Sequence, residues 1–256
     1  MSLVRSQADA LVSGGYMKTK KIVLGVGAHP DDMDFTSSGT IAKMVEEGWD
    51  AYYLVCTDGS RGSRLHNTTH QALAETRRDE QKAAGKILGL KNIFFLDHED
   101  TQLMCEPSLK EEIVRVIRTV RPEVVITMDP TFYFSTKSPW KTGVSFINHT
   151  DHRAAGLATM DAVFPLARDL LSFPEHALEG LKPHKVDELW FTSFKEREHV
   201  IDITATFEKK LKALAAHASQ FDDFPKIKKE VYDHAVHFAD EEEFEFGESF
   251  IRLVLD

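Results

Sequence analysis

Short apolar runs alternate with longer segments of helical spacing along the first half of the chain. The apolar runs are rich in β-branched and aromatic residues, and glycine or proline closes most of the helical segments. Strands are predicted at 21–27, 51–56, 92–96 and 124–128, and helices at 38–47, 70–88 and 108–120. Such alternation is typical of a parallel sheet covered by helices on both faces. We therefore expect an α/β fold, a Rossmann-like three-layer sandwich with a mostly parallel central sheet.

The pattern is less regular in the second half of the chain. Residues 129–149 form a long predicted loop rich in aromatic residues. A helix is predicted over 150–171, interrupted or ended near Pro165. Further strands are predicted at 188–191 and 200–203, helices at 206–218 and 227–238, and a closing apolar run at 250–255. No sequence repeat divides the chain, so we expect one domain over 17–256, preceded over 1–16 by an extension that is disordered or serves for docking.

The overall composition limits the classes of binding partner and the cellular locations that we expect for the protein. The chain has 256 residues, of which 42% are hydrophobic, and its formal net charge is −10. Nucleic acids and anionic membranes require a basic face, so neither is an expected partner. No apolar run approaches the roughly 20 residues that span a bilayer, and the N-terminus lacks the apolar core of a signal peptide. The isolated Cys56 and Cys105 are expected to be reduced thiols of a cytoplasmic protein.

Polar side chains follow the predicted strands at the points where the strands end. His29, Asp31 and Asp32 come directly after the first strand, and Asp100 and Asp129 follow the third and fourth. Ligands of parallel sheets bind beyond the carboxyl ends of the strands. The glycine fingerprint of dinucleotide-binding sheets is missing after the first strand, so a nucleotide cofactor is not expected. This edge of the sheet is therefore the expected functional site.

The residue types at this edge suit a catalytic zinc ion. Such an ion needs three protein ligands and one open position for water. His29 and Asp32 are three residues apart on a turn, and His152 is the best third ligand, in the first turn of the helix predicted from residue 150. Asp31 is then free to act as a general base beside the metal.

His149 and Asp151 complete the expected acid–base set. His149 precedes His152 by three residues and is expected to face the same cleft without binding the metal. Its imidazole would stabilise an oxyanion or protonate a leaving nitrogen, and Asp151 would hold that imidazole in one tautomer. The whole set is equipped to hydrolyse an amide.

Two segments, AHPDD at 28–32 and HTDH at 149–152, together resemble the paired motifs of the PIG-L/LmbE-like family of zinc-dependent de-N-acetylases. The resemblance spans roughly residues 21–220, with further similar segments at 39–41, 57–59, 77–89 and 212–220. It implies the following roles: zinc ligands His29, Asp32 and His152, general base Asp31, and acid or oxyanion stabiliser His149 oriented by Asp151. It also makes Arg77 a candidate for substrate contact.

The resemblance further implies an activity and an assembly. Family members remove acetyl or related acyl groups from amino sugars, so the expected function is hydrolysis of the N-acetyl group of a small N-acetylglucosamine-type substrate, with Zn²⁺ as cofactor. A homo-oligomer, a trimer or a hexamer, is expected. Many members have glutamate directly after AHPDD, whereas Met33 and then Asp34 follow here. This departure leaves the zinc ligands intact and bears on substrate choice.

Two other functions are compatible with the same residues. One is an amidase of the same mechanism that acts on another acyl amide or a thiol conjugate, and the other is a sugar- or metal-binding module without catalysis. His234 and His237 also have three-residue spacing, but we expect them to lie on a surface helix. The aromatic residues of the loop 130–148 are expected to narrow the cleft and to contribute to subunit packing.

Overall fold

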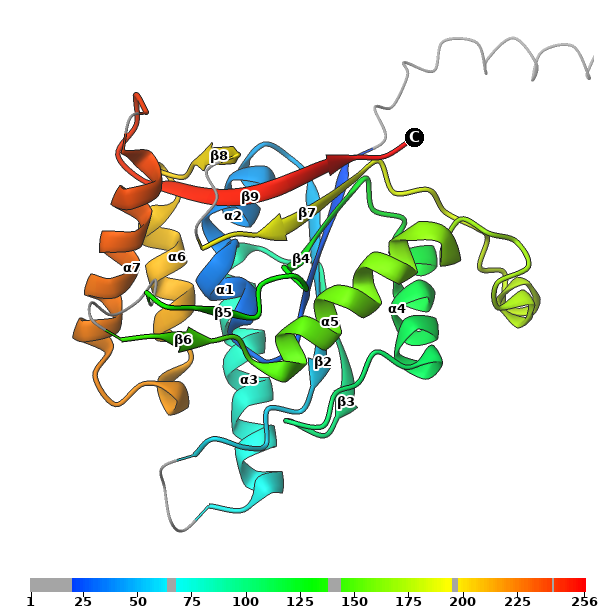
Figure 1. The fold of residues 1–256 in the computed structure, drawn as a ribbon, viewed down its shortest axis with the longest axis horizontal. Coiled ribbons are helices and arrows are strands. Elements are labelled where there is room, and N and C mark those ends of the chain that lie inside the picture. Colours follow the sequence, from blue (N-terminus) through cyan, green and yellow to red (C-terminus); the bar gives the residue numbers. More distant parts are fainter. Residues whose placement is uncertain (1–19, 64–67, 138–143, 195–197, 241) are drawn as a thin grey trace, which may run out of the picture.

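A seven-stranded sheet lies at the centre of the molecule (Figure 1). The computed structural model describes residues 20–63, 68–137, 144–194, 198–240 and 242–256. The strands, in the order in which they lie side by side, are β3 (Asn92–His98), β2 (Asp50–Thr57), β1 (Ile22–Gly27), β4 (Val124–Met128), β7 (Glu188–Thr192), β9 (Gly247–Val254) and β8 (His199–Asp202). Neighbours from β3 to β7 are parallel, and β9 is antiparallel to β7 and β8. The predicted mostly parallel sheet is confirmed.

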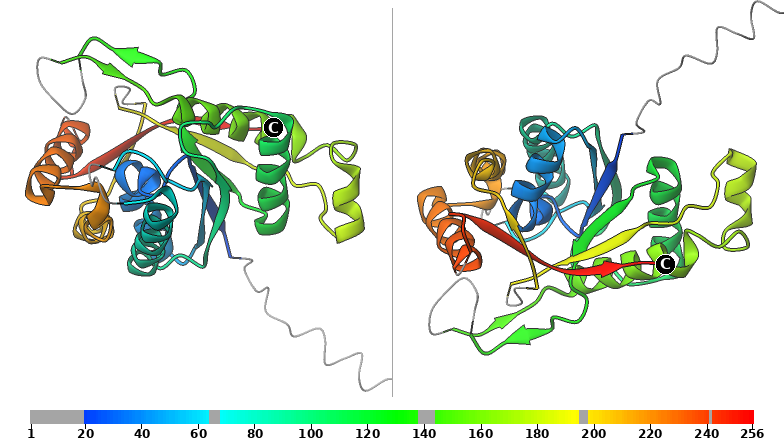
Figure 2. Two further views of the ribbon diagram at one scale, coloured as in Figure 1. Left: turned by 90° about the horizontal axis from the view of Figure 1, so that it is seen from below. Right: turned by 90° about the horizontal axis from the view of Figure 1, so that it is seen from above.

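Helices cover both faces of this sheet (Figure 2). One face packs against α1 (Asp32–Thr36), α2 (Ser38–Glu46), α3 (His70–Leu88) and α6 (Phe207–Ala215). The other face packs against α4 (Pro107–Val120) and α5 (Thr150–Asp161). The last helix, α7 (Phe224–Ala239), contacts β9 and shares a third apolar cluster with α6. The predicted three layers are therefore present.

The strand β1 shows why its sequence is apolar at nearly every position. Val23 is buried on the side of α2 and α3, whereas its neighbour Leu24 is buried on the side of α4. A strand covered on both faces has no solvent side and so needs no polar residue. Gly25 makes room for the Tyr53 ring of β2, which an added Cβ would approach to 3.0 Å.

The ends of α3 follow from local chemistry that the sequence displays. The Thr69 side chain accepts a hydrogen bond from the N–H of Ala72 at 3.1 Å, which satisfies a free donor of the first turn. Gly89 ends the helix with a φ of 86°, a left-handed conformation that glycine adopts without strain. The predicted bounds of this helix are confirmed.

The predicted helix over 150–171 is shorter in the structure. α5 ends at Asp161 and is followed by η2 (Ala162–Leu166), which is kinked at Phe164, where the backbone is extended directly before Pro165, so the interruption lies where it was expected. Proline has no N–H to donate, so a regular helix does not continue through it. A separate 3-10 turn, η3 (Pro174–Glu179), follows farther along.

The long loop after β4 contains a small sheet of its own. β5 (Phe134–Ser135) and β6 (Phe146–Ile147) pair in antiparallel fashion. Figures 1 and 2 show this pair standing apart from the central sheet, next to the start of α5. Strands of two residues have no periodicity for sequence analysis to detect. The short α1 and the turn η4 (Ala218–Gln220) were missed for the same reason.

Two further predictions concern the chain as a whole. The extension at 1–16 lies outside the described residues, and the single domain over 17–256 stays a prediction. Within the described residues, no helix is both long and apolar enough to cross a membrane.

Candidate active site

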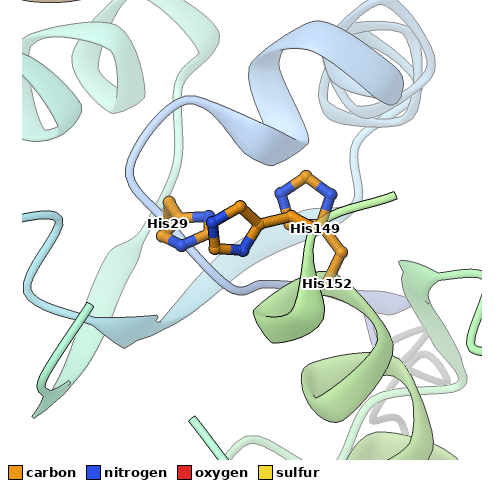
Figure 3. A group of neighbouring side chains, drawn as sticks. All are labelled: His29, His149 and His152. Atoms are coloured by element: carbon orange, nitrogen blue, oxygen red, sulfur yellow. The ribbon is translucent and has the colours of Figure 1, made fainter. Parts of the chain in front are cut away.

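The two sequence motifs meet at the carboxyl ends of two neighbouring strands. β1 and β4 pair directly, so the segment after β1 lies beside the segment after β4. Gly156 allows α5 to pack tightly on the end of β4, because an added Cβ would collide with the carbonyl oxygen of Met128. The start of α5 therefore presents His149 and His152 to His29 (Figure 3).

Three imidazole rings form the centre of the site. The ring centroid of His29 lies 4.7 Å from that of His149 and 5.2 Å from that of His152. Each ring offers a nitrogen atom, and the three nitrogens lie within 4.8 Å of one another. Neutral imidazole is a common ligand of zinc and related metals. The spacing would suit a metal ion, and the other contacts of each ring separate the expected ligands from His149.

The carboxylate of Asp32 joins two of these rings. Its Oδ1 lies 3.0 Å from Nε2 of His152, and its Oδ2 lies 3.5 Å from Nδ1 of His29. Oδ2 also accepts a hydrogen bond from the backbone N–H of His29 at 2.7 Å. Burial alone would raise the pKa of Asp32, but His152 and His29 hold that pKa well below its usual value. Asp32 is thus a buried carboxylate that remains charged.

The outer nitrogens of His29 and His152 have fixed partners. Nε2 of His29 lies 3.2 Å from Asp100 Oδ1 and 3.2 Å from Asp151 Oδ2. Nδ1 of His152 lies 3.1 Å from Asn148 Oδ1. Metal-binding histidines usually donate their second N–H to such an oxygen, which fixes the ring and its tautomer. The two rings therefore present Nδ1 of His29 and Nε2 of His152 to Asp32.

The donor set and the local charge both fit a divalent metal. His29, Asp32 and His152 offer two nitrogens and one oxygen, a combination that catalytic zinc accepts. The carboxylates of Asp32, Asp100 and Asp151 raise the pKa of His29 well above its usual value, although burial opposes this. Several buried carboxylates that lie this close together need a positively charged partner. A metal ion at this place would provide one.

Asp151 has a different main partner from the expected one. Its carboxylate was expected to orient His149, but Oδ2 accepts from the Thr101 N–H at 2.7 Å and contacts His29. The distance from Asp151 Oδ1 to His149 Nδ1 is 4.0 Å. The backbone N–H of Asp151 instead donates to His149 Nδ1 at 3.2 Å. The carboxylate therefore orients His29, and the main chain orients His149, since α5 points its first N–H groups at the ring.

This contact determines the tautomer of His149. An N–H donor at Nδ1 leaves the ring proton of a neutral imidazole on Nε2. Burial and the nearby rings of His29 and His152 lower the pKa of His149, which favours the neutral form. His149 is thus arranged as a hydrogen-bond donor through Nε2.

Asp31 lies next to the ligand group with an unusual backbone. It precedes α1 with a φ of 91°, in the left-handed region that side chains other than glycine seldom adopt. Its N–H donates to Oε1 of Gln81 at 2.9 Å. Burial, together with the charge of Asp32, raises the pKa of Asp31 to about 7.

Arg77 is buried behind the site. It is 6% exposed, and its guanidinium donates to the backbone carbonyls of Gly59 and Arg61 and lies 3.8 Å from Asp100. These contacts fix the loop after β2 and the carboxylate that holds His29. Substrate contact by Arg77 stays a prediction.

A cavity of about 310 Å³ opens beside Asp31, Asp32 and His152. Most of its wall is apolar and is formed by Phe35, Met128, Phe146, Phe194 and Ile227. A half-buried Glu230 of α7 adds a carboxylate to this wall. The cavity has the size and lining of a small-molecule site.

The aromatic loop contributes to this cavity in part. Phe146 lines it, and the Phe132 ring stacks on Phe146 with centroids 5.8 Å apart. Tyr133 and Phe134 are 60% and 65% exposed in the single chain. Trp140 lies outside the described residues. In the described part of this loop, Phe146 lines the cavity. Packing of the loop against another subunit stays a prediction.

The helix α7 packs His234 partly against the fold and leaves His237 exposed at the surface. The His234 ring lies 4.9 Å from that of Phe238, and burial, with His237 and Lys210 nearby, lowers the pKa of His234 to about 4.

Two residues that support the site, Asn148 and Gln81, were not singled out from the sequence. Gln81 contacts Asp31 only because α3 meets the turn after β1, whereas Asn148 adjoins the second motif and contacts His152 four residues later.

Comparison with known proteins assigns the chain to a family. Residues 24–163 match the family described as PIG-L: GlcNAc-PI de-N-acetylase. Diacetylchitobiose deacetylase of Thermococcus kodakarensis is 35% identical over 221 residues, which cover 86% of this chain and 77% of the relative. A probable N-acetyl-α-D-glucosaminyl L-malate deacetylase 2 of Bacillus anthracis is 29% identical over 217 residues, which cover 80% of this chain and 84% of the relative.

A solved structure of a deacetylase supports the same family assignment. N,N'-diacetylchitobiose deacetylase from Pyrococcus horikoshii, in complex with its inhibitor MPG, matches with a TM-score of 0.81 at 25% identity. That match covers 99% of this chain and 94% of the other. The family match spans more than half of the sequence and includes both motifs of the site. The chain therefore belongs to the PIG-L family of de-N-acetylases.

Proposed function

We propose that the protein is a zinc-dependent hydrolase that removes the N-acetyl group from a small N-acetylglucosamine-type substrate. The observation on which this rests is that His29, Asp32 and His152 converge beside Asp31 at the wall of an aromatic cavity. The name of the Thermococcus relative, a diacetylchitobiose deacetylase, supports an amino-sugar substrate.

His29, Asp32 and His152 would hold the zinc ion through two nitrogens and one oxygen. Zinc bound there supplies a Lewis acid that polarises the acyl carbonyl and makes a water molecule more acidic. The chain keeps the three donors together, because Asp100 and Asp151 fix His29 and Asn148 fixes His152.

Asp31 and His149 would divide the proton transfer and the charge stabilisation between them. Asp31 accepts a proton from the water that attacks the acyl carbon, and it passes a proton to the nitrogen as the C–N bond breaks. His149 donates a hydrogen bond from Nε2 to the acyl oxygen, where negative charge develops. The products are acetate and the free amine.

The lining of the cavity favours a neutral sugar. Phe146 and Phe194 offer apolar faces on which a pyranose ring can stack. The carboxylates of Asp32, Asp100 and Asp151 already balance the charge of a divalent metal, which leaves Glu230 as an unbalanced carboxylate in the wall. Among the described residues that line this cavity, none is lysine or arginine. An anionic group on the substrate would therefore be repelled.

The location and the assembly belong to the same proposal. Cys56 and Cys105 are free thiols, which suits a reducing cytoplasm. Exposed apolar side chains on the β5–β6 pair, Phe134 and Ile147, favour a homo-oligomer. The resemblance to the family makes a trimer or a hexamer the proposed state.

Metal analysis combined with an assay for released amine tests the proposal. Protein purified without chelator should contain about one zinc per chain. It should release amine from N-acetylglucosamine and N,N'-diacetylchitobiose, and both properties should be lost after chelation and return with added zinc. Protein that binds no zinc and stays inactive when zinc is supplied would refute the proposal. A panel of acyl amides without a pyranose ring separates the sugar deacetylase from a general amidase.

A further inference from the structure

The backbone of Asp31 needs external support. Its φ of 91° places a side chain with a Cβ in the left-handed region, which aspartate tolerates only when its surroundings hold it there. The N–H of Asp31 lies at the turn between β1 and α1, outside the regular hydrogen bonds of either element. Its partner is a side chain from a different part of the fold.

That partner is Gln81, which lies on α3 and is 1% exposed. Its Oε1 accepts the N–H of Asp31 at 2.9 Å, and its Nε2 donates to Oδ2 of Asp34 at 2.8 Å. One amide group thus joins the backbone of the residue before α1 to a side chain of the first turn of that helix. Because both ends of the amide are engaged, the Gln81 side chain has a single orientation.

A third buried group contacts the same oxygen of Asp34. Nε2 of His217, which follows α6, lies 2.8 Å from the same Oδ2 atom. Asp34 and His217 are both fully buried. Gln81, Asp34 and His217 therefore form one chain of contacts that connects α3, α1 and the end of α6, three helices that lie together behind the site (Figure 1).

We propose that Gln81, held by Asp34 and His217, is the positioning residue that keeps Asp31 in its left-handed conformation and so directs the Asp31 carboxylate at the substrate. This inference rests on the proposed function, in which Asp31 accepts the proton from water. Gln81 has no described contact with His29, Asp32 or His152, so its effect should reach the reaction through Asp31 and leave the metal ligands unchanged.

The test is a double-mutant cycle between Gln81 and Asp31. Gln81→Met keeps the length of the side chain and removes both hydrogen bonds. Gln71→Met, on an exposed turn of the same helix, is the matched control. Zinc content, kcat and KM on N,N'-diacetylchitobiose are measured for each variant, alone and combined with Asp31→Asn.

We expect Gln81→Met to lower kcat by about 10- to 100-fold, because a displacement of about 1 Å at a reacting group has that effect. KM and zinc content should stay within about twofold of the parent protein, as in Gln71→Met. In the Asp31→Asn background the further loss should be under about threefold, because Gln81 has no base left to position.

Two results would overturn the inference. The first is a loss of equal factor in both backgrounds, which would mean that Gln81 acts on the fold in general. The second is an unchanged kcat in Gln81→Met. Should Gln81→Met not yield folded protein, Gln81→Asn replaces it in the same cycle. An Asp31→Asn variant with full activity would instead contradict the proposed function, and the two failures are therefore distinct.

Discussion

Nε2 of His29 lies 3.2 Å from Oδ2 of Asp151, a residue 122 positions later in the chain. This contact joins the two sequence motifs directly, and it assigns Asp151 to the orientation of His29. The Asp151 carboxylate also accepts a hydrogen bond from the N–H of Thr101. The segment that follows β3 therefore fixes the position of this carboxylate.

Asp151→Ala should therefore weaken zinc binding. The loss of an oxygen that orients a metal-binding histidine typically lowers affinity by about 10- to 100-fold. Competition with a zinc chelator measures this, and Asp161→Ala, at the far end of α5, is the control. If Asp151 served His149 instead, the variant would keep its zinc affinity and lose only rate.

The ligands and the base should separate in a second set of variants. His29→Ala, Asp32→Ala and His152→Ala should each lose zinc, because each removes a proposed ligand. Asp31→Asn should keep zinc and lose about two to four orders of magnitude in kcat, the usual contribution of a general base. Zinc content and single-turnover rates, measured on the same samples, check both statements. Loss of zinc in Asp31→Asn would contradict the division of roles.

Glu230 should influence the choice between neutral and anionic substrates. Glu230→Lys replaces the unbalanced carboxylate of the cavity by a cation. It should raise the ratio of kcat/KM for N-acetylglucosaminyl malate to that for N,N'-diacetylchitobiose by about tenfold, equivalent to about 1.4 kcal/mol. The exposed Glu243, which does not line the cavity, provides the control Glu243→Lys. An unchanged ratio would remove Glu230 from substrate selection.

A buried ion pair should make a large contribution to stability. Nζ of Lys210 lies 2.6 Å from Oε1 of Glu248, and the two side chains are 3% and 5% exposed. Glu248 also accepts the N–H groups of Gly39 and Thr40 at the start of α2. Lys210→Met leaves this carboxylate buried without its cation, so the free energy of unfolding should fall by about 3–5 kcal/mol.

Urea denaturation measures that change. The double variant Lys210→Met/Glu248→Gln should recover part of the loss, because it removes the buried charge and its single amide oxygen still accepts one of the two N–H groups. A double variant no more stable than the single one would contradict this explanation.

The free energy of unfolding should depend on pH through the titration of His234. Its pKa in the folded protein is about 4, whereas an exposed histidine titrates at about 6.5. Between these values the unfolded chain binds the extra proton, so the contribution of His234 to folding is present above about pH 6.5 and is lost as the pH falls towards 4. His234→Leu should therefore lose less stability than the parent protein between pH 7 and pH 5 in urea titrations. His70→Leu, at an exposed position, should behave like the parent.

Much of the fold could be predicted because its signals are local. The apolar residues of β1 and β4 are consecutive, and α3 has a capping threonine directly before its first residue and a glycine directly after its last. The meeting of His29 with His152 also followed from a general property of parallel sheets, whose ligand sites lie beyond the strand ends. These inferences need no knowledge of the distances between elements.

The remaining features depend on which surfaces meet. The sequence places Asp151 two residues from His149, but the turn of α5 directs its carboxylate to His29 and only its N–H to His149. Gln81 is one of several polar residues on α3, and its role depends on the unusual φ of Asp31. The β5–β6 pair has too few residues for a periodic pattern. The direction in which the side chain points, rather than its place in the sequence, decides the roles of Asp151 and Gln81.

The pairing of β1 with β4 also bears on how such an enzyme can diversify. The two motifs meet through one strand pair and the close packing of α5 at Gly156, so the loop between β4 and α5 can gain or lose residues without separating them. Phe146 reaches the cavity from the loop after β4, which lengthens by insertion at little thermodynamic penalty. Descendants of this scaffold can therefore exchange one acylated amine for another while inheriting the same chemistry.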